Sequence, residues 1–182
     1  MRIAVLLIPA LGLALQGAHA EIEKVAIPTA KGMSFHWWPK LPALKGWRHE
    51  REQSLHYGIY ALAPEGSTFA DAQTVMYAKA VYKPQRPEIQ TLEMFIRSDR
   101  KASLSRSPDI VVQEHAALST ADGKKLRSFT FFPRKDGNWE RVSYGEEGDF
   151  YLVFAVSSRS LAGYKAAEKA YMQLIRSYKE KR

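Results

Sequence analysis

The chain has 182 residues, and its 27 Lys and Arg against 19 Asp and Glu give a net charge of +8 at neutral pH. It contains no cysteine, which excludes a disulfide framework and a lipidated amino-terminal cysteine. The cations are scattered and accompany no nucleic-acid-binding motif, so nucleic acid is not an expected partner. The basic surface is either simply solvated or faces an anionic component.

Residues 1–20 have the pattern of a secretory signal peptide. Arg2 provides a cationic start, an apolar run extends from Ile3 to Leu15, and Ala18-His19-Ala20 forms a cleavage site with small side chains at its two alanines. The apolar run is shorter than the about 20 residues that span a bilayer. We therefore expect cleavage before Glu21, one domain over 21–182 with no transmembrane anchor after cleavage, and a periplasmic or secreted location.

The first part of the mature chain is expected to contain short strands. Prolines interrupt the segment from Glu21 to Gly46, which predicts an irregular lead-in. Apolar residues alternate from Ser54 to Leu62, which predicts a strand that ends at the turn Pro64-Glu65-Gly66. The segment from Thr74 to Tyr82 is apolar on both faces, which is typical of a central strand in a covered sheet.

Two segments have helical periodicity. Apolar residues at helical spacing predict a helix from Pro87 to Asp99, and the polar stretch from Arg100 to Pro108 is expected to form a surface loop. The segment from Ser160 to Arg182 predicts an amphipathic helix that packs on the sheet. Its apolar stripe consists of Leu161, Tyr164, Ala167, Tyr171, Leu174, Ile175 and Tyr178.

An antiparallel meander is predicted between these two helices. The expected strands are Asp109 to Leu118, Lys125 to Phe132, Trp139 to Tyr144 and Phe150 to Ser157. Each of the three breaks contains a glycine beside an acidic residue, as tight reversals require. Together these elements predict an α+β fold in which helices cover an antiparallel sheet.

The order of these elements resembles the PsbP-like group (Mog/PsbP/DcrB-like). The matching segments are Gly46-Trp47, Pro64-Glu65-Gly66, Thr120 to Lys124, Trp139 to Tyr144, Phe150 to Val156 and Leu174 to Tyr178. The group includes photosystem II extrinsic subunits, Ran-binding Mog proteins and bacterial exported proteins. The resemblance implies an α/β/α sandwich and an accessory or binding role without a shared active site, and it assigns no functional residue.

The sequence contains no catalytic, cofactor or metal motif. No serine lies in a Gly-x-Ser-x-Gly motif. His49-Glu50 and His56 do not match the His-Glu-x-x-His spacing of zinc enzymes. We therefore expect neither a cofactor nor a metal. Three carboxylates are clustered at Glu146, Glu147 and Asp149, where they form either a solvated hairpin turn or a site for acid–base chemistry.

The densest aromatic and basic neighbourhood is the candidate binding surface. It consists of Trp37, Trp38, Lys40, Lys45, Trp47 and Arg48. Indole rings beside cations can anchor a partner because they offer a large contact area at a small entropic cost. Alternatively, the rings cap the edge of the core. A recognition role requires that at least one of the three tryptophans is exposed.

Two function hypotheses follow. The first is an exported, non-enzymatic accessory or binding protein that presents this surface to an envelope component or a protein partner. The alternative is an envelope enzyme that acts on an anionic substrate through Glu146, Glu147 and Asp149. A cavity that gathers titratable groups would favour the enzyme, and a shallow aromatic cleft would favour binding.

Overall fold

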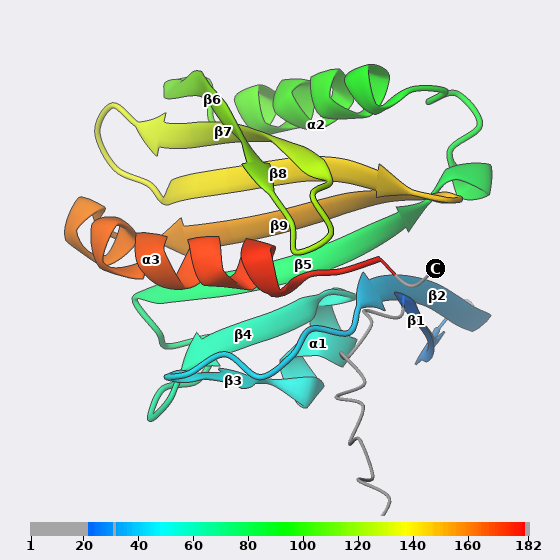
Figure 1. Ribbon diagram of the computed structural model, residues 1–182, viewed down its shortest axis with the longest axis horizontal. Coiled ribbons are helices and arrows are strands. Elements are labelled where there is room, and N and C mark those ends of the chain that lie inside the picture. The colour runs from blue at the N-terminus through cyan, green and yellow to red at the C-terminus, as the bar shows by residue number, and fades with distance from the viewer. Residues whose placement is uncertain (1–21, 31, 181–182) are drawn as a thin grey trace, which may run out of the picture.

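The computed structural model describes residues 22–30 and 32–180. The predicted signal peptide and its cleavage site lie outside the described residues. Within the described part, the strands form one nine-stranded antiparallel sheet (Figure 1). This confirms the predicted α+β class with an antiparallel sheet.

The sheet has the strand order β1-β2-β5-β9-β8-β7-β6, and β4 adds to β5 and carries β3 at its other edge. The strands are β1 (Ile22–Thr29), β2 (Gly32–Pro39), β3 (Trp47–His49), β4 (Tyr60–Pro64), β5 (Thr74–Tyr82), β6 (Ile110–Ser119), β7 (Lys125–Pro133), β8 (Trp139–Glu147) and β9 (Phe150–Ser158). The helices are α1 (Arg51–Tyr57), α2 (Leu92–Arg106) and α3 (Leu161–Ser177), with a 3₁₀ turn, η1, at Lys83–Gln85.

Strand β5 lies at the centre of the sheet, as predicted. It pairs along its whole length with β9, from Thr74 opposite Ser158 to Tyr82 opposite Phe150. Its side chains alternate between two separate core clusters, one on each face of the sheet. Both faces of this strand are therefore covered, which explains why its sequence is apolar on both sides.

The two long helices pack against opposite faces. Helix α3 contributes Tyr171 and Leu174 to the cluster that contains Met76, and α2 contributes Phe95 and Ile96 to the cluster that contains Tyr151. Figure 1 shows α3 crossing in front of the sheet. No helix in residues 22–30 and 32–180 is long and apolar enough to cross a membrane.

The predicted meander is present as β6 to β9. Gly123, Gly137 and Gly148 in its turns have φ of +83°, +142° and +49°, a region that glycine enters without steric cost. Strand β8 continues beyond the predicted Tyr144 to Glu147, so Glu146 and Glu147 belong to a strand and only the next two residues turn.

The predicted strand from Ser54 to Leu62 is wrong in its first half. Residues Arg51–Tyr57 form α1, which ends at Gly58 with φ of +67°, and β4 begins only at Tyr60. The prediction rests on apolar residues two positions apart, such as Leu55 and Tyr57. Tyr57 does not belong to an apolar face, because it is 53% exposed and faces solvent rather than the core. In a segment this short, helical and strand periods are hard to distinguish.

Helix α2 begins later and ends later than predicted. Thr91 caps it by accepting a hydrogen bond from the Met94 amide at 3.2 Å. The helix then continues to Arg106 through the segment that was expected to form a loop. Only Phe95 and Ile96 are buried, so the second half of α2 carries no apolar stripe that could have revealed it.

The first and last elements of the described residues also differ from expectation. The lead-in is a regular hairpin in which β1 and β2 pair over eight residues each. Helix α3 covers Leu161–Ser177, with Ser160 as its cap, and its predicted stripe is buried from Ala167 to Tyr178. Leu161 is wrong as a stripe residue, because it lies in the first turn and is 38% exposed.

Candidate functional site

The predicted binding surface is not assembled as one surface. Trp38 is 0% exposed, its indole nitrogen donates to Glu23 at 3.2 Å, and the Arg51 guanidinium lies 5.6 Å from its ring centroid. Trp38 is therefore a core residue that cannot touch a partner. None of the three tryptophans is exposed, since Trp37 and Trp47 are half-buried.

Trp37 and Trp47 lie far apart in the sheet. Trp37 pairs with Ala80 of β5, whereas Trp47 pairs with Pro64 at the end of β4. Because Leu62 pairs with Met76, the register places Pro64 beside Thr74, about 20 Å from Ala80 at the usual strand rise. Trp37 instead stacks on Tyr82, with ring centroids 5.2 Å apart.

The cations of the predicted surface have separate surroundings. Arg48 forms an ion pair with Glu50 at 2.7 Å and donates to the Ser67 carbonyl at 2.9 Å, so it ties β3 to its neighbours. Lys40 and Lys45 are exposed in the segment between β2 and β3, which is held to the core by Leu41 and Leu44.

Two of the three clustered carboxylates are bound by neighbouring side chains at the β8–β9 turn. The Lys83 ammonium lies 3.1 Å from Glu146, and the Lys83 amide donates to the Asp149 carbonyl at 2.8 Å. The Tyr178 hydroxyl donates to Glu147, whose pKa is raised by burial. None of the three carboxylates is among the residues that line the cavity at the carboxyl end of α2 or the two smaller hollows of the described residues.

A serine–histidine pair exists, but it is structural. His49 Nε2 lies 2.9 Å from Ser54 Oγ, which is 0% exposed. Ser54 Oγ donates to the Glu50 carbonyl and accepts from the Ala61 amide, both at 2.9 Å. Because the single hydroxyl proton is used by Glu50, His49 Nε2 must donate to Ser54. The hydroxyl is therefore fully bonded and inaccessible to a substrate.

The strongest candidate site is a cavity of about 720 Å³ at the carboxyl end of α2, which we call the α2-end cavity. Tyr77, Phe131 and Glu140 come from three strands of the sheet face that α2 covers. The remaining lining comes from the end of α2 and the start of β6 (Ser103, Arg106, Ser107, Pro108, Asp109 and Ile110) and from the β7–β8 connection (Pro133, Arg134, Lys135, Asp136, Gly137 and Asn138).

The cavity forms because α2 covers only part of its sheet face. Phe95 and Ile96 fill the space beneath the first half of the helix. Beyond them the helix presents short or charged side chains, and after Arg106 the chain leaves for β6. The β7–β8 turn, with Gly137 at φ of +142°, closes the remaining side. The floor of the cavity is therefore a part of the sheet that α2 does not cover.

Glu140 is the distinctive group of the floor. Its carboxylate accepts a hydrogen bond from the Ser157 hydroxyl at 2.7 Å. Burial raises its pKa, although that hydrogen bond and the charge of Arg106 act in the opposite direction. A carboxyl group kept in a site where ionisation is disfavoured is a common feature of ligand and active sites.

Tyr77 adds a hydrogen-bond donor. Burial, followed by the negative charges of Glu140 and Asp99, raises its pKa, so the hydroxyl keeps its proton at neutral pH. Among residues 22–30 and 32–180 this hydroxyl has no hydrogen-bond partner. A donor that opens into a cavity without a protein acceptor is available to a ligand.

The rim of the α2-end cavity carries cations without an ion-pair partner in the described part of the chain, beside the two exposed carboxylates Asp109 and Asp136. Arg134 and Lys135 are exposed and form no ion pair with any residue that the structure describes. Arg106 makes only a long contact, 3.5 Å from its Nη2 to Ser103 Oγ. The arrangement thus combines a floor of one carboxyl and one hydroxyl with a rim that can meet an anionic group.

Sequence reasoning missed every residue of this cavity. Phe131 and Glu140 are neighbours because β7 and β8 pair in that register, and Tyr77 joins them from a strand more distant in the chain. None of these residues belongs to a recognisable motif. The only local signal was the basic turn at Arg134-Lys135, which resembles any solvated hairpin.

Comparison of the chain with protein-family models and with curated proteins found no match. Within the described ranges, no group of three or more His, Asp or Glu side chains is placed to hold a metal ion.

Proposed function

We propose that the protein is an exported, non-enzymatic binding protein that holds a small polar ligand with an anionic group in the α2-end cavity. The single observation that carries this proposal is the combination, around one cavity of the described residues, of the unpaired rim cations Arg134 and Lys135 with the half-buried Glu140 carboxyl and the free Tyr77 hydroxyl on the floor. The ligand is an envelope component, and its site replaces the indole surface suggested by the sequence.

The chemistry of the cavity defines the ligand class. A volume of about 720 Å³ lies within the range of ordinary small-molecule sites. Arg134 and Lys135 would meet a carboxylate or phosphate at the rim. Glu140 would accept a hydrogen bond from an amino or hydroxyl group deeper in the site, and the Phe131 ring would cover an apolar portion between them.

Binding is favoured over catalysis by what lines the cavity. The serines of the lining, Ser103 and Ser107, have no histidine or carboxylate hydrogen-bonded to their hydroxyls in residues 22–30 and 32–180. A nucleophile needs such a base within hydrogen-bond reach. Of the carboxylates on which the alternative enzyme hypothesis rests, Glu146 is bound by Lys83 and Glu147 by Tyr178, so that hypothesis gains no support from them.

We further propose that the chain is a PsbP-like α/β/α sandwich. Support comes from the antiparallel meander and from α2 and α3 on opposite sheet faces. A binding or accessory role is what that resemblance implies.

A thermal-shift screen tests the ligand proposal. The mature chain is heated with small carboxylates, phosphates and amino acids, each at a high concentration. A ligand at 100 times its Kd raises the Tm of a domain of this size by roughly 5 to 10 °C. The double variant Arg134→Ala/Lys135→Ala should lose most of that rise.

The matched control is Lys165→Ala/Lys169→Ala, which removes the same charge from the exposed side of α3. It should keep the full ligand response. A panel in which no compound raises the wild-type Tm would contradict the proposal. A response that survives in the rim variant would place the ligand elsewhere.

Export is tested separately by mass spectrometry of the product recovered from the envelope or the medium. The mass should correspond to a chain that begins at Glu21, because Ala18 and Ala20 have the small side chains that signal peptidase accepts. An intact Met1 in that fraction would contradict the signal-peptide prediction.

A further inference from the structure

The β1–β2 hairpin has one face in the core and one face open. Val25 and Trp38 are buried against the body of the protein. On the other face, the register places Lys24 beside Trp37, Ala26 beside Phe35, and Pro28 beside Met33. Directly opposed residues of two strands lie on the same face, so these six side chains form a single strip, which we call the hairpin strip.

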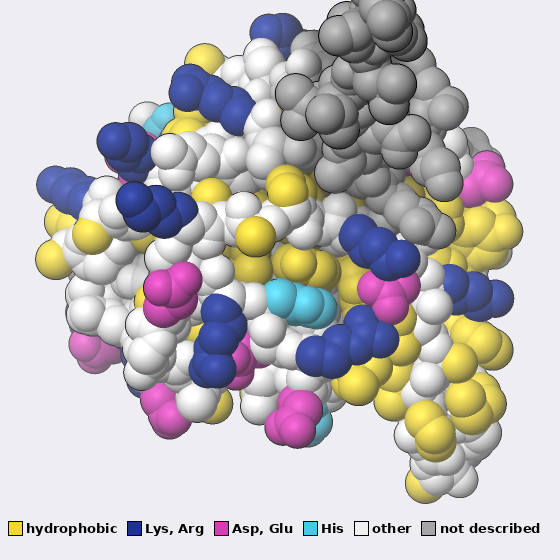
Figure 2. Space-filling model, turned by 60° about the horizontal axis from the view of Figure 1, so that its bottom comes forward, with side chains coloured by type: hydrophobic (Ala, Val, Ile, Leu, Met, Phe, Trp, Pro, Cys, Tyr) yellow, Lys and Arg dark blue, Asp and Glu magenta, His cyan; other side chains and the backbone are white. Residues whose placement is uncertain are grey.

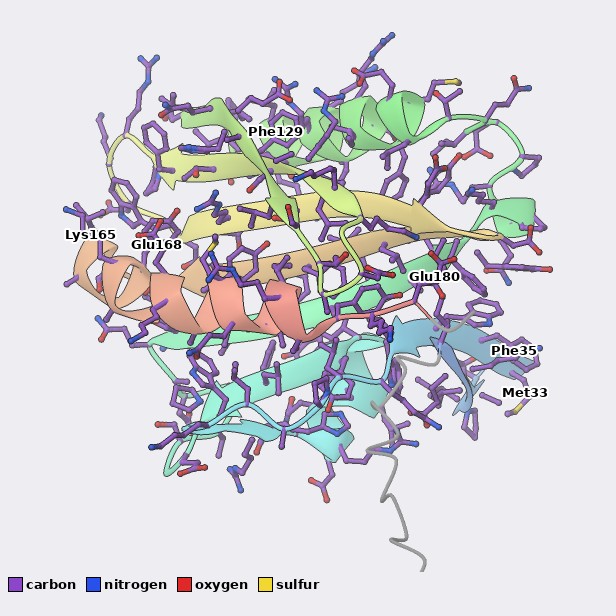
Figure 3. All side chains as sticks on the ribbon, in the orientation of Figure 1. Met33, Phe35, Phe129, Lys165, Glu168 and Glu180 are labelled. Atoms are coloured by element: carbon purple, nitrogen blue, oxygen red, sulfur yellow. The ribbon has the colours of Figure 1, made fainter. Side chains whose placement is uncertain are left out.

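The hairpin strip is apolar and accessible. Met33 is 54% exposed and Phe35 is 42% exposed. Figure 3 places both at the end of the molecule opposite to Lys165 of α3. In Figure 2 hydrophobic side chains gather at the same right-hand end. Isolated exposed apolar residues are ordinary, but a contiguous strip at a projecting end marks an interaction surface.

The inner end of the strip is fixed to the body by aromatic contacts. Trp37 packs on Tyr82 with ring centroids 5.2 Å apart and on Phe150 at 6.3 Å. The projecting residues therefore stand on a rigid base and would keep their orientation when they meet a partner.

The charge of the hairpin strip is exclusively positive. The Lys24 ammonium lies 4.5 Å from the centroid of the Phe35 ring and 5.8 Å from that of Trp37. The acidic residue of β1, Glu23, points to the opposite face, where it binds Arg51 and Trp38. No described residue places a carboxylate on the strip, and the whole chain has a net charge of +8.

These features select an anionic surface that also accepts apolar side chains. The outer edge of β1 pairs with no strand among residues 22–30 and 32–180. Its backbone groups would be unsatisfied in hydrocarbon, so the hairpin must lie flat at headgroup depth with only side chains inserted. Amphipathic segments that bind in this way bury their apolar face by about 5 to 10 Å, which Met and Phe side chains can reach.

We propose that the hairpin strip docks the protein onto an anionic lipid bilayer. Met33 and Phe35 enter the boundary between headgroups and acyl chains, and Lys24 lies against the lipid phosphates. This surface is separate from the α2-end cavity, so the docking proposal does not depend on the proposed ligand.

Vesicle sedimentation with the mature chain tests the docking. The two probes are vesicles of phosphatidylcholine mixed with phosphatidylglycerol and vesicles of phosphatidylcholine alone. The wild type should bind the anionic vesicles, and raised salt should weaken that binding. Met33→Ser/Phe35→Ser should weaken it at least ~10-fold through lost apolar burial. Lys24→Gln should weaken it about 5-fold.

The matched control is Met94→Ser/Leu104→Ser on α2, since those side chains are 39% and 38% exposed. It should bind as the wild type does, and unchanged Tm values establish that both double variants fold. Wild-type protein that does not sediment, or equal losses in the two double variants, would overturn the proposal. Equal binding to neutral vesicles, or a dimer that only the hairpin variant abolishes, would also overturn it.

Discussion

The two faces of the sheet differ in how a central tyrosine hydroxyl is hydrogen-bonded. On the α3 face, the Tyr171 hydroxyl is fully buried and bound to Ser143 Oγ at 2.7 Å and to the Phe154 carbonyl at 2.9 Å. On the α2 face, the Tyr77 hydroxyl opens into a cavity. The buried side-chain N or O atom that lacks a partner among the described residues, Arg100 Nε, also lies on the α2 side.

This difference separates residues that stabilise the fold from residues that are available to a ligand. Where packing is complete and each polar group is satisfied, truncation should cost stability. Where a polar group lines an open cavity, the same chemical change should cost little stability and should alter binding. The following predictions test this contrast.

The largest effect is expected at the centre of the α3 face. Leu174 is 0% exposed, so Leu174→Ala should destabilise the protein by about 2 to 5 kcal/mol through cavity formation. Lys165→Ala, at an exposed position of the same helix, should change stability by no more than about 0.5 kcal/mol. Urea denaturation of both variants measures this, and equal losses would disprove the packing of α3.

A matched pair of tyrosine variants compares the two faces directly. Tyr171→Phe leaves the Ser143 hydroxyl and the Phe154 carbonyl without their buried partner, so it should cost about 1 to 3 kcal/mol. Tyr77→Phe removes a hydroxyl that has no protein partner, so it should stay within about 0.5 kcal/mol. Similar free energies of unfolding for the two variants would show that the faces do not differ.

Glu140→Gln should stabilise the protein at neutral pH, by about 0.5 to 1 kcal/mol. The folded state raises the pKa of Glu140 above 4.5. The associated stability is therefore complete below pH 4.5 and is lost as the pH rises through the folded pKa. The variant should show its advantage at pH 7 and lose it near pH 4. A destabilised variant at pH 7 would contradict the raised pKa of this carboxyl.

The smallest expected effect concerns His49. Burial, and then the charge of Arg51, lowers its pKa below 6.5, so the stability that depends on the neutral ring is present above pH 6.5. It is lost as the pH falls through the folded pKa. His49→Gln keeps a donor for Ser54 and should reduce the fall in the urea midpoint between about pH 7.5 and pH 5.5. If the urea midpoint of the variant falls as much as that of the wild type, His49 is not the cause of the fall.

Sequence predicted the meander well because its signals are local. An acidic residue beside a glycine locates each chain reversal to within two or three positions. The strands between the reversals are then recognised from alternating apolar and polar residues. It failed at α1, where Leu55 and Tyr57 fit a strand pattern although Tyr57 faces solvent. It also failed for the second half of α2, which lies beyond the core and carries no apolar stripe.

The candidate site could not be predicted for a different reason. Tyr77, Arg106 and Glu140 come from three elements, and no local pattern records that β5, α2 and β8 meet. The three indoles show the opposite case. Trp37, Trp38 and Trp47 are close in sequence, but strand alternation and strand register place them in different parts of the sheet. Proximity in the chain therefore did not produce one surface that contains all three indoles.

The pairing of β5 with β9 also governs how the chain can fold. Partners in this ladder are 68 to 84 residues apart, whereas each later strand of the meander pairs with the strand just before it. Hairpins can form as soon as their strands exist, but closing the central ladder carries the entropy cost of a long loop. A growing chain that lacks residues 150–158 can form the β1–β2 hairpin and the β6–β8 ladder, but it cannot join them. Until β9 is available, one edge of β5 stays unpaired, and this is when the chain most needs protection from aggregation.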